Sequence, residues 1–135
     1  MFGDSNGTCS TAAGTCGLVD NSGNVTVIGE IMGQYSKFIQ PGYVRASATA
    51  TPIGGVYVSA YTGTVSGTQH YVIVAINANT SSVILSFTLN NGTVTSLTPY
   101  QSTSAAGLAP APAVTVTAGQ FNYTLPAASI TTLVQ

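Results

Sequence analysis

The spacing of apolar residues changes once along the chain and separates one helix from a series of strands. Between residues 26 and 40 apolar side chains recur every three or four positions, which predicts an amphipathic helix. Its stripe consists of Ile28, Ile31, Met32, Tyr35, Phe38 and Ile39. We expect Thr26 to cap the amino end and Pro41 to stop the helix, because proline cannot continue one.

The opposite face of this predicted helix is polar. It carries Gln34, Ser36 and Lys37, so the apolar stripe is the side that we expect to dock on something. Glu30 falls in the first turn, where a carboxylate interacts favourably with the helix dipole.

From residue 43 onward the pattern is typical of β-structure. Short runs rich in Val, Ile, Thr and Tyr recur every eight to twelve residues between turn-forming residues. They predict strands at residues 43–49, 55–61, 69–77, 82–89, 93–100, 113–117, 119–125 and 129–134. The expected fold class is all-β, an antiparallel β-sandwich of about eight strands preceded by one helix. Its parts are a Gly/Ser/Thr-rich loop over 1–25, the helix over 26–42 and the sandwich over 43–135.

Finer patterns assign the strands to places in the sandwich. Residues 83–89 alternate as a half-buried strand does, whereas residues 71–76 are apolar on both faces and should form a central strand. Asn and Gly at 90–92 and Gly at 117–119 predict two hairpin turns. The Ala/Pro-rich stretch 107–112 is expected to be a loop between strands.

Charge is scarce in this chain and excludes several functions. Charged residues make up 4% of the sequence, and residues 46–135 carry none. Two basic residues are too few to bind a nucleic acid backbone or a membrane surface. No run of eighteen apolar residues predicts a membrane-spanning helix. Apolar residues, at 44%, suffice to build a core.

The two cysteines lie close together, at Cys9 and Cys16. Their spacing favours a local disulfide that closes a small loop. A metal site would need two further ligands, and His70 is the only histidine; a redox pair would normally be Cys-x-x-Cys. We therefore predict a disulfide, no metal and no cofactor.

The acidic residues do not form a catalytic set. Hydrolysis of a glycosidic bond needs two carboxyl groups roughly 5–9 Å apart. Only Asp4, Asp20 and Glu30 occur, all before the β-region, and Asp20 lies in a turn-forming context. His70 has no nucleophile-elbow sequence to work with. We predict no catalytic residues.

Tyrosines are the remaining functional candidates. Tyr57 and Tyr61 share one face of a predicted strand, about 13 Å apart, and Tyr100 lies at a strand end. They either belong to the core or rim of the sandwich or form a platform on which sugar rings stack.

The composition, rich in Thr, Ser, Gly, Ala and Asn, predicts an extracellular protein. Five Asn-x-Ser/Thr sequons permit glycosylation, at Asn6, Asn24, Asn79, Asn91 and Asn122. No secretory signal opens the sequence, so we expect a piece of a longer precursor or a chain begun at an added Met.

Several segments carry a family resemblance. They are residues 23–26, 32–43, 56–61, 72–77, 86–89, 94–100 and 125–134. In this order they resemble the last barrel helix and the C-terminal β-sandwich side domain of glycoside hydrolase family 30 xylanases.

The resemblance implies a secreted enzyme that acts on glucuronoxylan or a related β-glycan by a retaining mechanism. It places the two catalytic glutamates on strands of a (β/α)8 barrel, upstream of everything present here. It also implies that the apolar helix stripe packs on that barrel and that strand material from before the barrel helps to complete the side domain. Where some family members have an Arg and a Tyr that recognise glucuronate, this chain has the segment 3–17, which contains neither residue.

The leading hypothesis is a non-catalytic side domain, inactive alone, that braces the barrel and contacts xylan weakly. One alternative is a self-associating extracellular structural or filament protein, since ninety uncharged residues leave strand edges unguarded. Another is a free-standing carbohydrate-binding module.

Overall fold

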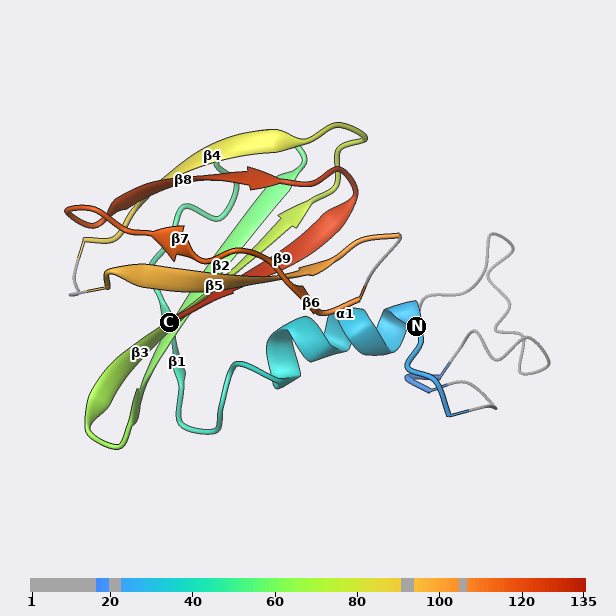
Figure 1. Cartoon of the computed structure of the whole chain (residues 1–135), viewed down its shortest axis with the longest axis horizontal. Helices are drawn as coiled ribbons and strands as arrows, with labels where there is room; N and C mark the ends of the chain where they lie inside the picture. The colour runs from blue at the N-terminus through green and yellow to red at the C-terminus, as the bar shows by residue number, and fades with distance from the viewer. Residues whose placement is uncertain (1–16, 20–22, 91–93, 105–106) are drawn as a thin grey trace.

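Two antiparallel sheets face each other in the computed structural model, and one helix lies on the outer side of the larger sheet (Figure 1). The structure describes residues 17–19, 23–90, 94–104 and 107–135. The elements are α1 Val27–Ser36, β1 Val44–Ala46, β2 Val56–Val65, β3 Thr68–Asn77, β4 Val83–Thr88, β5 Ser96–Ser102, β6 Ala109–Pro110, β7 Val114–Thr115, β8 Gln120–Leu125 and β9 Ser129–Val134. The antiparallel sandwich with one preceding helix is confirmed.

The two sheets differ greatly in size. The larger follows the order β1-β2-β3-β9-β5-β6, with β7 also paired to β5, whereas the smaller contains only β4 and β8. The register aligns Tyr61 with Val72 and Val72 with Val134 across three neighbouring strands. The central position predicted for residues 71–76 is confirmed, because β3 pairs with β2 on one side and β9 on the other.

The core lies between the two sheets. The larger sheet contributes Ile73, Leu97 and Leu133, which are buried, and Phe121 of β8 meets them from the smaller sheet. The rings of Phe121 and Phe87 stack with their centroids 4.7 Å apart. The alternation predicted for residues 83–89 is confirmed, since every second side chain of that run points to the core.

The helix begins as predicted but ends earlier. The Thr26 hydroxyl accepts a hydrogen bond from the Gly29 N–H at 3.2 Å, so Thr26 is the cap. α1 ends at Ser36, four residues before the predicted end. The prediction was wrong because Phe38 leaves the helix to place its ring 4.5 Å from that of Tyr100 on β5, a tertiary contact that local periodicity does not encode.

One predicted hairpin is wrong. β4 pairs with β8, whereas β5 pairs with β6, β7 and β9, so β4 and β5 do not form a hairpin; residues 91 and 92 of the predicted turn lie outside the described residues. Asn and Gly favour a turn but do not select the strand that follows it as a partner. The stretch 107–112, expected to be a loop, also holds the two-residue strand β6.

The other predicted hairpin is confirmed. Thr117 and Gln120 exchange both backbone hydrogen bonds, at 3.0 and 2.9 Å. The central residues Ala118 and Gly119 have φ angles of 49° and 76°, as a type I′ turn requires.

Replacing Ala118 with Asn should stabilise the protein by about 0.5–1 kcal/mol, because Asn tolerates the left-handed backbone conformation better than Ala does. Urea denaturation of Ala118→Asn measures this. Ala48→Asn is the control, since Ala48 is exposed and has no positive φ. Equal stabilities of wild type and Ala118→Asn would show that the turn is not strained.

Candidate functional site

The helix contacts the sandwich through a polar side chain. Gln34 is fully buried, and its Nε2 donates a hydrogen bond to Ser102 Oγ on β5 at 2.8 Å. The Thr132 hydroxyl on β9 donates to the Gln34 carbonyl at 2.9 Å. The Leu108 N–H donates to the same Ser102 oxygen at 3.0 Å. The expectation that Gln34 lies on the solvent side of the helix is therefore wrong: Ser102, 68 residues away, holds the side-chain amide inward, and Thr132, 98 residues away, bonds the main-chain carbonyl of Gln34.

Glycines allow the close approach on this side. A Cβ on Gly33 would lie 2.5 Å from a methyl carbon of Leu108, and a Cβ on Gly107 would overlap the Glu30 carboxylate. The side of α1 that carries Glu30, Gly33 and Gln34 thus packs on β5, β9 and the segment after Gly107.

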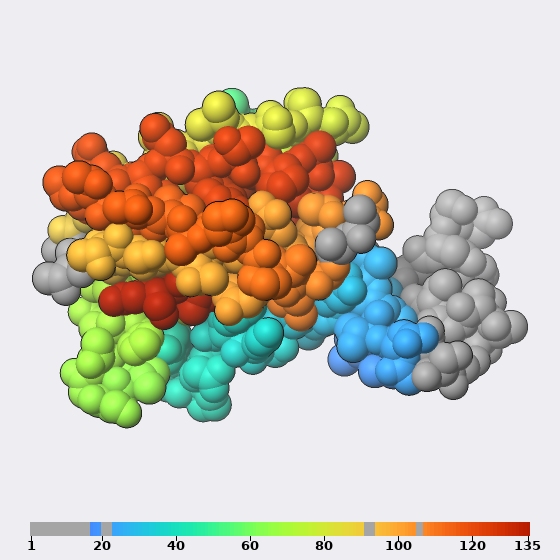
Figure 2. Space-filling model, in the orientation of Figure 1, coloured from blue at the N-terminus to red at the C-terminus, as the bar shows by residue number. Residues whose placement is uncertain are grey.

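Part of the apolar side of α1 is exposed, although Tyr35 and Phe38 of the same stripe contact the sandwich. Val27, Ile31 and Met32 are 62%, 40% and 52% exposed, and we call these three residues the outward face of α1. In Figures 1 and 2 the helix lies below β5 and β6 on the lower side of the molecule. Of the predicted apolar stripe, Ile31 and Met32 are exposed, whereas the other members, Ile28, Tyr35, Phe38 and Ile39, are half-buried.

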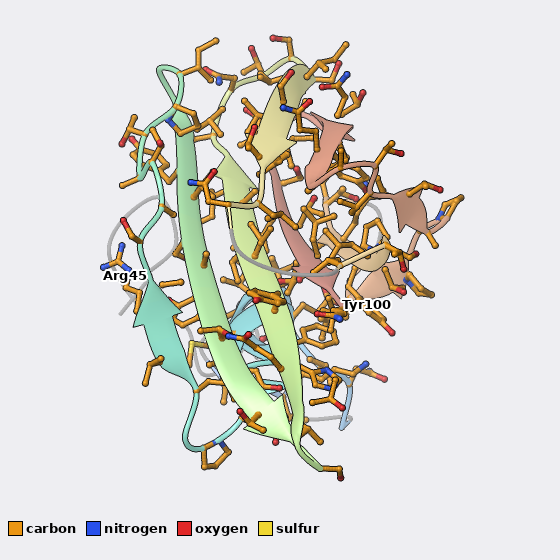
Figure 3. All side chains as sticks on the ribbon, turned by 90° about the vertical axis from the view of Figure 1, so that its left-hand side faces the viewer. Arg45 and Tyr100 are labelled. Carbon is orange, nitrogen blue, oxygen red and sulfur yellow. The ribbon has the colours of Figure 1, made fainter. Side chains whose placement is uncertain are left out.

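A groove runs beside α1 on the outer side of the larger sheet. Tyr35 of α1 meets Tyr61 of β2 edge to face, with ring centroids 6.5 Å apart. Next to this contact lies an open groove of about 230 Å³, lined by Tyr35, Arg45, Ala50, Thr51, Tyr57, Val58, Ser59 and Ile76. We call it the Arg45 groove. Arg45 projects at the β1 edge of the sheet (Figure 3).

The three predicted tyrosines do not form one platform. Tyr57 and Tyr61 share a face of β2, as predicted, and Tyr57 is 52% exposed. Tyr61 is half-buried against Tyr35. Tyr100 on β5 is half-buried beside Phe38, with Lys37 Nζ 5.2 Å from its ring centre. β3 and β9 separate β5 from β2, so Tyr100 lies about 14 Å away across the sheet, at the far side from Arg45 in Figure 3. Sugar binding by these tyrosines stays a prediction.

Titratable groups are sparse in the part of the chain that the structure describes. Glu30 is its only side-chain carboxylate, and it contains no group of three or more His, Cys, Asp or Glu that could hold a metal. Asp4, Asp20, Cys9 and Cys16 lie outside the described residues.

Burial raises the pKa of the Tyr123 phenol. A hydrogen bond that Gln101 donates to the phenol oxygen at 2.8 Å lowers this pKa and partly offsets the rise. No helix of the described segments is long and apolar enough to cross a membrane.

The sequons differ in their surroundings. The Asn79 side chain donates from Nδ2 to the Gly54 carbonyl and to Asn77 Oδ1, both at 3.1 Å, so this nitrogen is engaged in the fold. Asn122 is exposed on β8, and its Oδ1 accepts from Ser86 Oγ at 2.7 Å. Asn24 is exposed, and Asn6 and Asn91 lie outside the described residues.

Sequence reasoning did not single out Gln34, Tyr35 or Arg45 as site residues. A signal existed for Arg45, because it is the only charged residue after Lys37. No comparable signal existed for Gln34, whose partners Ser102 and Thr132 are distant in the sequence.

A β-sandwich whose attached helix leaves three large apolar side chains exposed is typical of a domain that packs against another. No model of a protein family matches the chain. The glucuronoxylanase XynC of Bacillus subtilis (strain 168) is 39% identical over 118 residues, which are 87% of this chain and 27% of that protein. The GH30 endoxylanase structure from Clostridium papyrosolvens C71 has a TM-score of 0.82 and 44% identity, and the match covers 88% of this chain and 30% of that one.

A family 30 subfamily 8 xylanase structure from Clostridium acetobutylicum also has a TM-score of 0.82, at 37% identity over 94% of this chain and 31% of that one. This chain is thus homologous to the C-terminal side domain of glycoside hydrolase family 30 xylanases. It spans less than a third of the length of these relatives.

Proposed function

We propose that this chain is the non-catalytic side domain of a secreted xylanase of the family 30 type and that it braces the catalytic barrel. The observation that carries this proposal is the outward face of α1. Three large apolar residues of one short helix are at least 40% exposed, while its Gln34 is fully buried. An amphipathic helix normally buries its apolar side, so this orientation supports a partner on the far side of α1.

The free energy available from burying these three side chains is sufficient for docking. Burying a large aliphatic side chain that was exposed contributes about 1.5–3 kcal/mol. Val27, Ile31 and Met32 expose between 40% and 62% of their surfaces, so each retains a substantial part of that contribution for a partner. The outward face is therefore the place where we expect the barrel to pack.

The smaller sheet supports a second contact. β4 pairs only with β8 among the described strands, and its Ile84 is 71% exposed. The strand contains no charge or proline that would discourage the pairing of another strand with its free edge. We propose that strand material from the catalytic part of the enzyme adds to β4.

A graft tests the proposal. This chain would replace the matching C-terminal part of the Clostridium papyrosolvens endoxylanase, to which it is 44% identical. The grafted enzyme should be soluble, unfold in one transition and retain xylanase activity, whereas this chain alone should release no reducing sugar. The control is the same enzyme truncated before the matching part. Two separate unfolding transitions, with activity no better than that of the truncated enzyme, would contradict bracing.

Self-association is a second candidate, favoured by the same exposed face of α1 and the unguarded β4 edge. If this chain served as a structural protein, these surfaces would bind further copies of it. Light scattering of the purified chain distinguishes the two functions: filaments or defined oligomers support self-association, and a monomer that enters the graft normally supports the side domain.

A further inference from the structure

A second groove lies at the end of the larger sheet, where the hairpin of β2 and β3 extends past β9. β9 pairs with β3 only over residues 72–77, and the turn before β1 lies beside the tip of this hairpin (Figure 1). The groove is open and measures about 370 Å³. We call it the Tyr43 groove, and its lining includes Tyr43, Val44, Thr62, Gly63, Thr64 and Gln69.

A glycine seats the aromatic ring of this groove. Val44 pairs with Thr62 in the register of β1 and β2, so Tyr43 comes next to Gly63 one position further along. A Cβ on Gly63 would overlap the carbon atoms of the Tyr43 ring, so the ring lies directly on the backbone of Gly63. Tyr43 is half-buried, and its hydroxyl has no hydrogen-bond partner among the described residues. A tyrosine held in this way combines an apolar surface with a free polar end.

Polar groups of the hairpin border the same opening. Thr64 and Gln69 are partners across β2 and β3, and both are exposed. Gln69 Nε2 donates a hydrogen bond to the Thr62 hydroxyl at 3.1 Å, and that hydroxyl donates to the His70 carbonyl at 3.1 Å. Gln69 Oε1 and the Thr64 hydroxyl have no such partner in the part of the chain that the structure describes. They are therefore free to bond the hydroxyls of a ligand.

The absence of charge restricts the class of ligand. Of the described residues that line the Tyr43 groove, none is charged, and Arg45 borders the other groove instead. A carboxylate or phosphate has no cation to pair with in this lining, whereas a neutral ligand rich in hydroxyls needs only the groups that are present. An aromatic surface attracts the partially positive C–H groups of a pyranose. The volume is also in the range of small-ligand pockets, about 300–1,000 Å³.

We propose that the Tyr43 groove binds a neutral pyranose unit of a polysaccharide chain. Tyr43 lies against the sugar ring, and Thr64 and Gln69 Oε1 bond its hydroxyls. The site shares no residue with the outward face of α1, so it stays separate from the surface that we expect to meet the barrel. The choice of a polysaccharide rests on the proposed function. The test uses this chain alone, so its failure and a failure of the graft are distinguishable.

Titration of the ¹⁵N-labelled chain followed by NMR tests the site. The probes are xylobiose and cellobiose, which are neutral β-1,4-linked disaccharides, and sorbitol, a polyol without a ring. At least one disaccharide should cause saturable shifts of the backbone signals of residues 43, 62–64 and 69, and sorbitol at the same concentrations should not. No saturable shift with either disaccharide, shifts confined to other residues, or equal binding of sorbitol would each overturn the proposal.

Two matched pairs of substitutions make the test specific. Tyr43→Ala should weaken disaccharide binding about threefold to tenfold, whereas Tyr57→Ala, which removes an exposed tyrosine outside this groove, should change it less than twofold. Gln69→Ala should weaken binding about threefold, and Gln120→Ala, at an exposed glutamine of the smaller sheet, should have no effect.

Both glutamines are exposed, so their variants should fold even if Tyr43→Ala does not, and circular dichroism verifies this. Equal losses within the glutamine pair, or a larger loss from Tyr57→Ala than from a folded Tyr43→Ala, would overturn the assignment of the sugar to the Tyr43 groove.

Discussion

Replacing Ile31 and Met32 with Asp is expected to leave this chain folded and to separate it from the barrel in the grafted xylanase. Both side chains are at least 40% exposed, so the substitutions should change the free energy of unfolding of the chain alone by less than about 1 kcal/mol. In the graft the same two carboxylates would be buried without partners. Burying an unpaired charge costs several kcal/mol, and the apolar contribution of two side chains is lost as well.

Calorimetry and a xylanase assay of the grafted variant measure this effect. We expect the single unfolding transition to split in two and the activity to fall to that of the truncated enzyme. Val44→Asp with Val65→Asp is the matched control, because these two apolar residues are also exposed, at 62% and 42%, but do not belong to α1. If both double variants behave alike, the outward face of α1 is not the docking surface.

Gln34→Ala should be the most damaging single substitution in the helix. It removes the amide that donates to Ser102 and leaves a cavity under α1 where the side chain is now fully buried. The expected loss is about 2–4 kcal/mol of unfolding free energy, from the cavity and from the hydrogen bond together. The amide hydrogens of α1 should exchange faster, because the helix has lost a main contact with β5.

Gln40→Ala is the control for that measurement. Gln40 is an exposed glutamine four residues after α1, and its Nε2 donates only to the Lys37 carbonyl. Its replacement should cost less than about 0.5 kcal/mol. Urea denaturation of both variants compares them directly. Similar, small losses would mean that α1 is held on the sheet by contacts other than the Gln34 amide.

The orientation of α1 connects these two predictions. Gln34 attaches the helix to β5 and β9 by hydrogen bonds, and Ile31 and Met32 remain available on the other side. The helix can therefore belong to the sandwich and still offer an apolar surface to a barrel. Tyr35 and Phe38 pack on the sandwich as well, so the surface left for a barrel is only part of the apolar stripe.

Much of the β-structure was predictable from local patterns. The alternation at residues 83–89 reports directly which side chains face a core, because successive residues of a strand point to opposite faces. The doubly apolar run 71–76 indicated a central strand for the same reason. The Thr117–Gln120 turn and the Thr26 cap depend on neighbours within a few residues, so the sequence carries them explicitly.

The sequence by itself determined which segments become strands and helix, that the chain is nearly uncharged, and that α1 has an apolar side. Only the tertiary structure decided that Ile31 and Met32 of this side stay exposed, that β4 and β5 belong to different sheets, and that Arg45, Tyr57 and Tyr35 border one groove. The physical reason is the separation in sequence over which each effect acts, because periodicity and turn preferences involve residues only a few positions apart. The position of Gln34 instead depends on Ser102 and Thr132, 68 and 98 residues further along the chain.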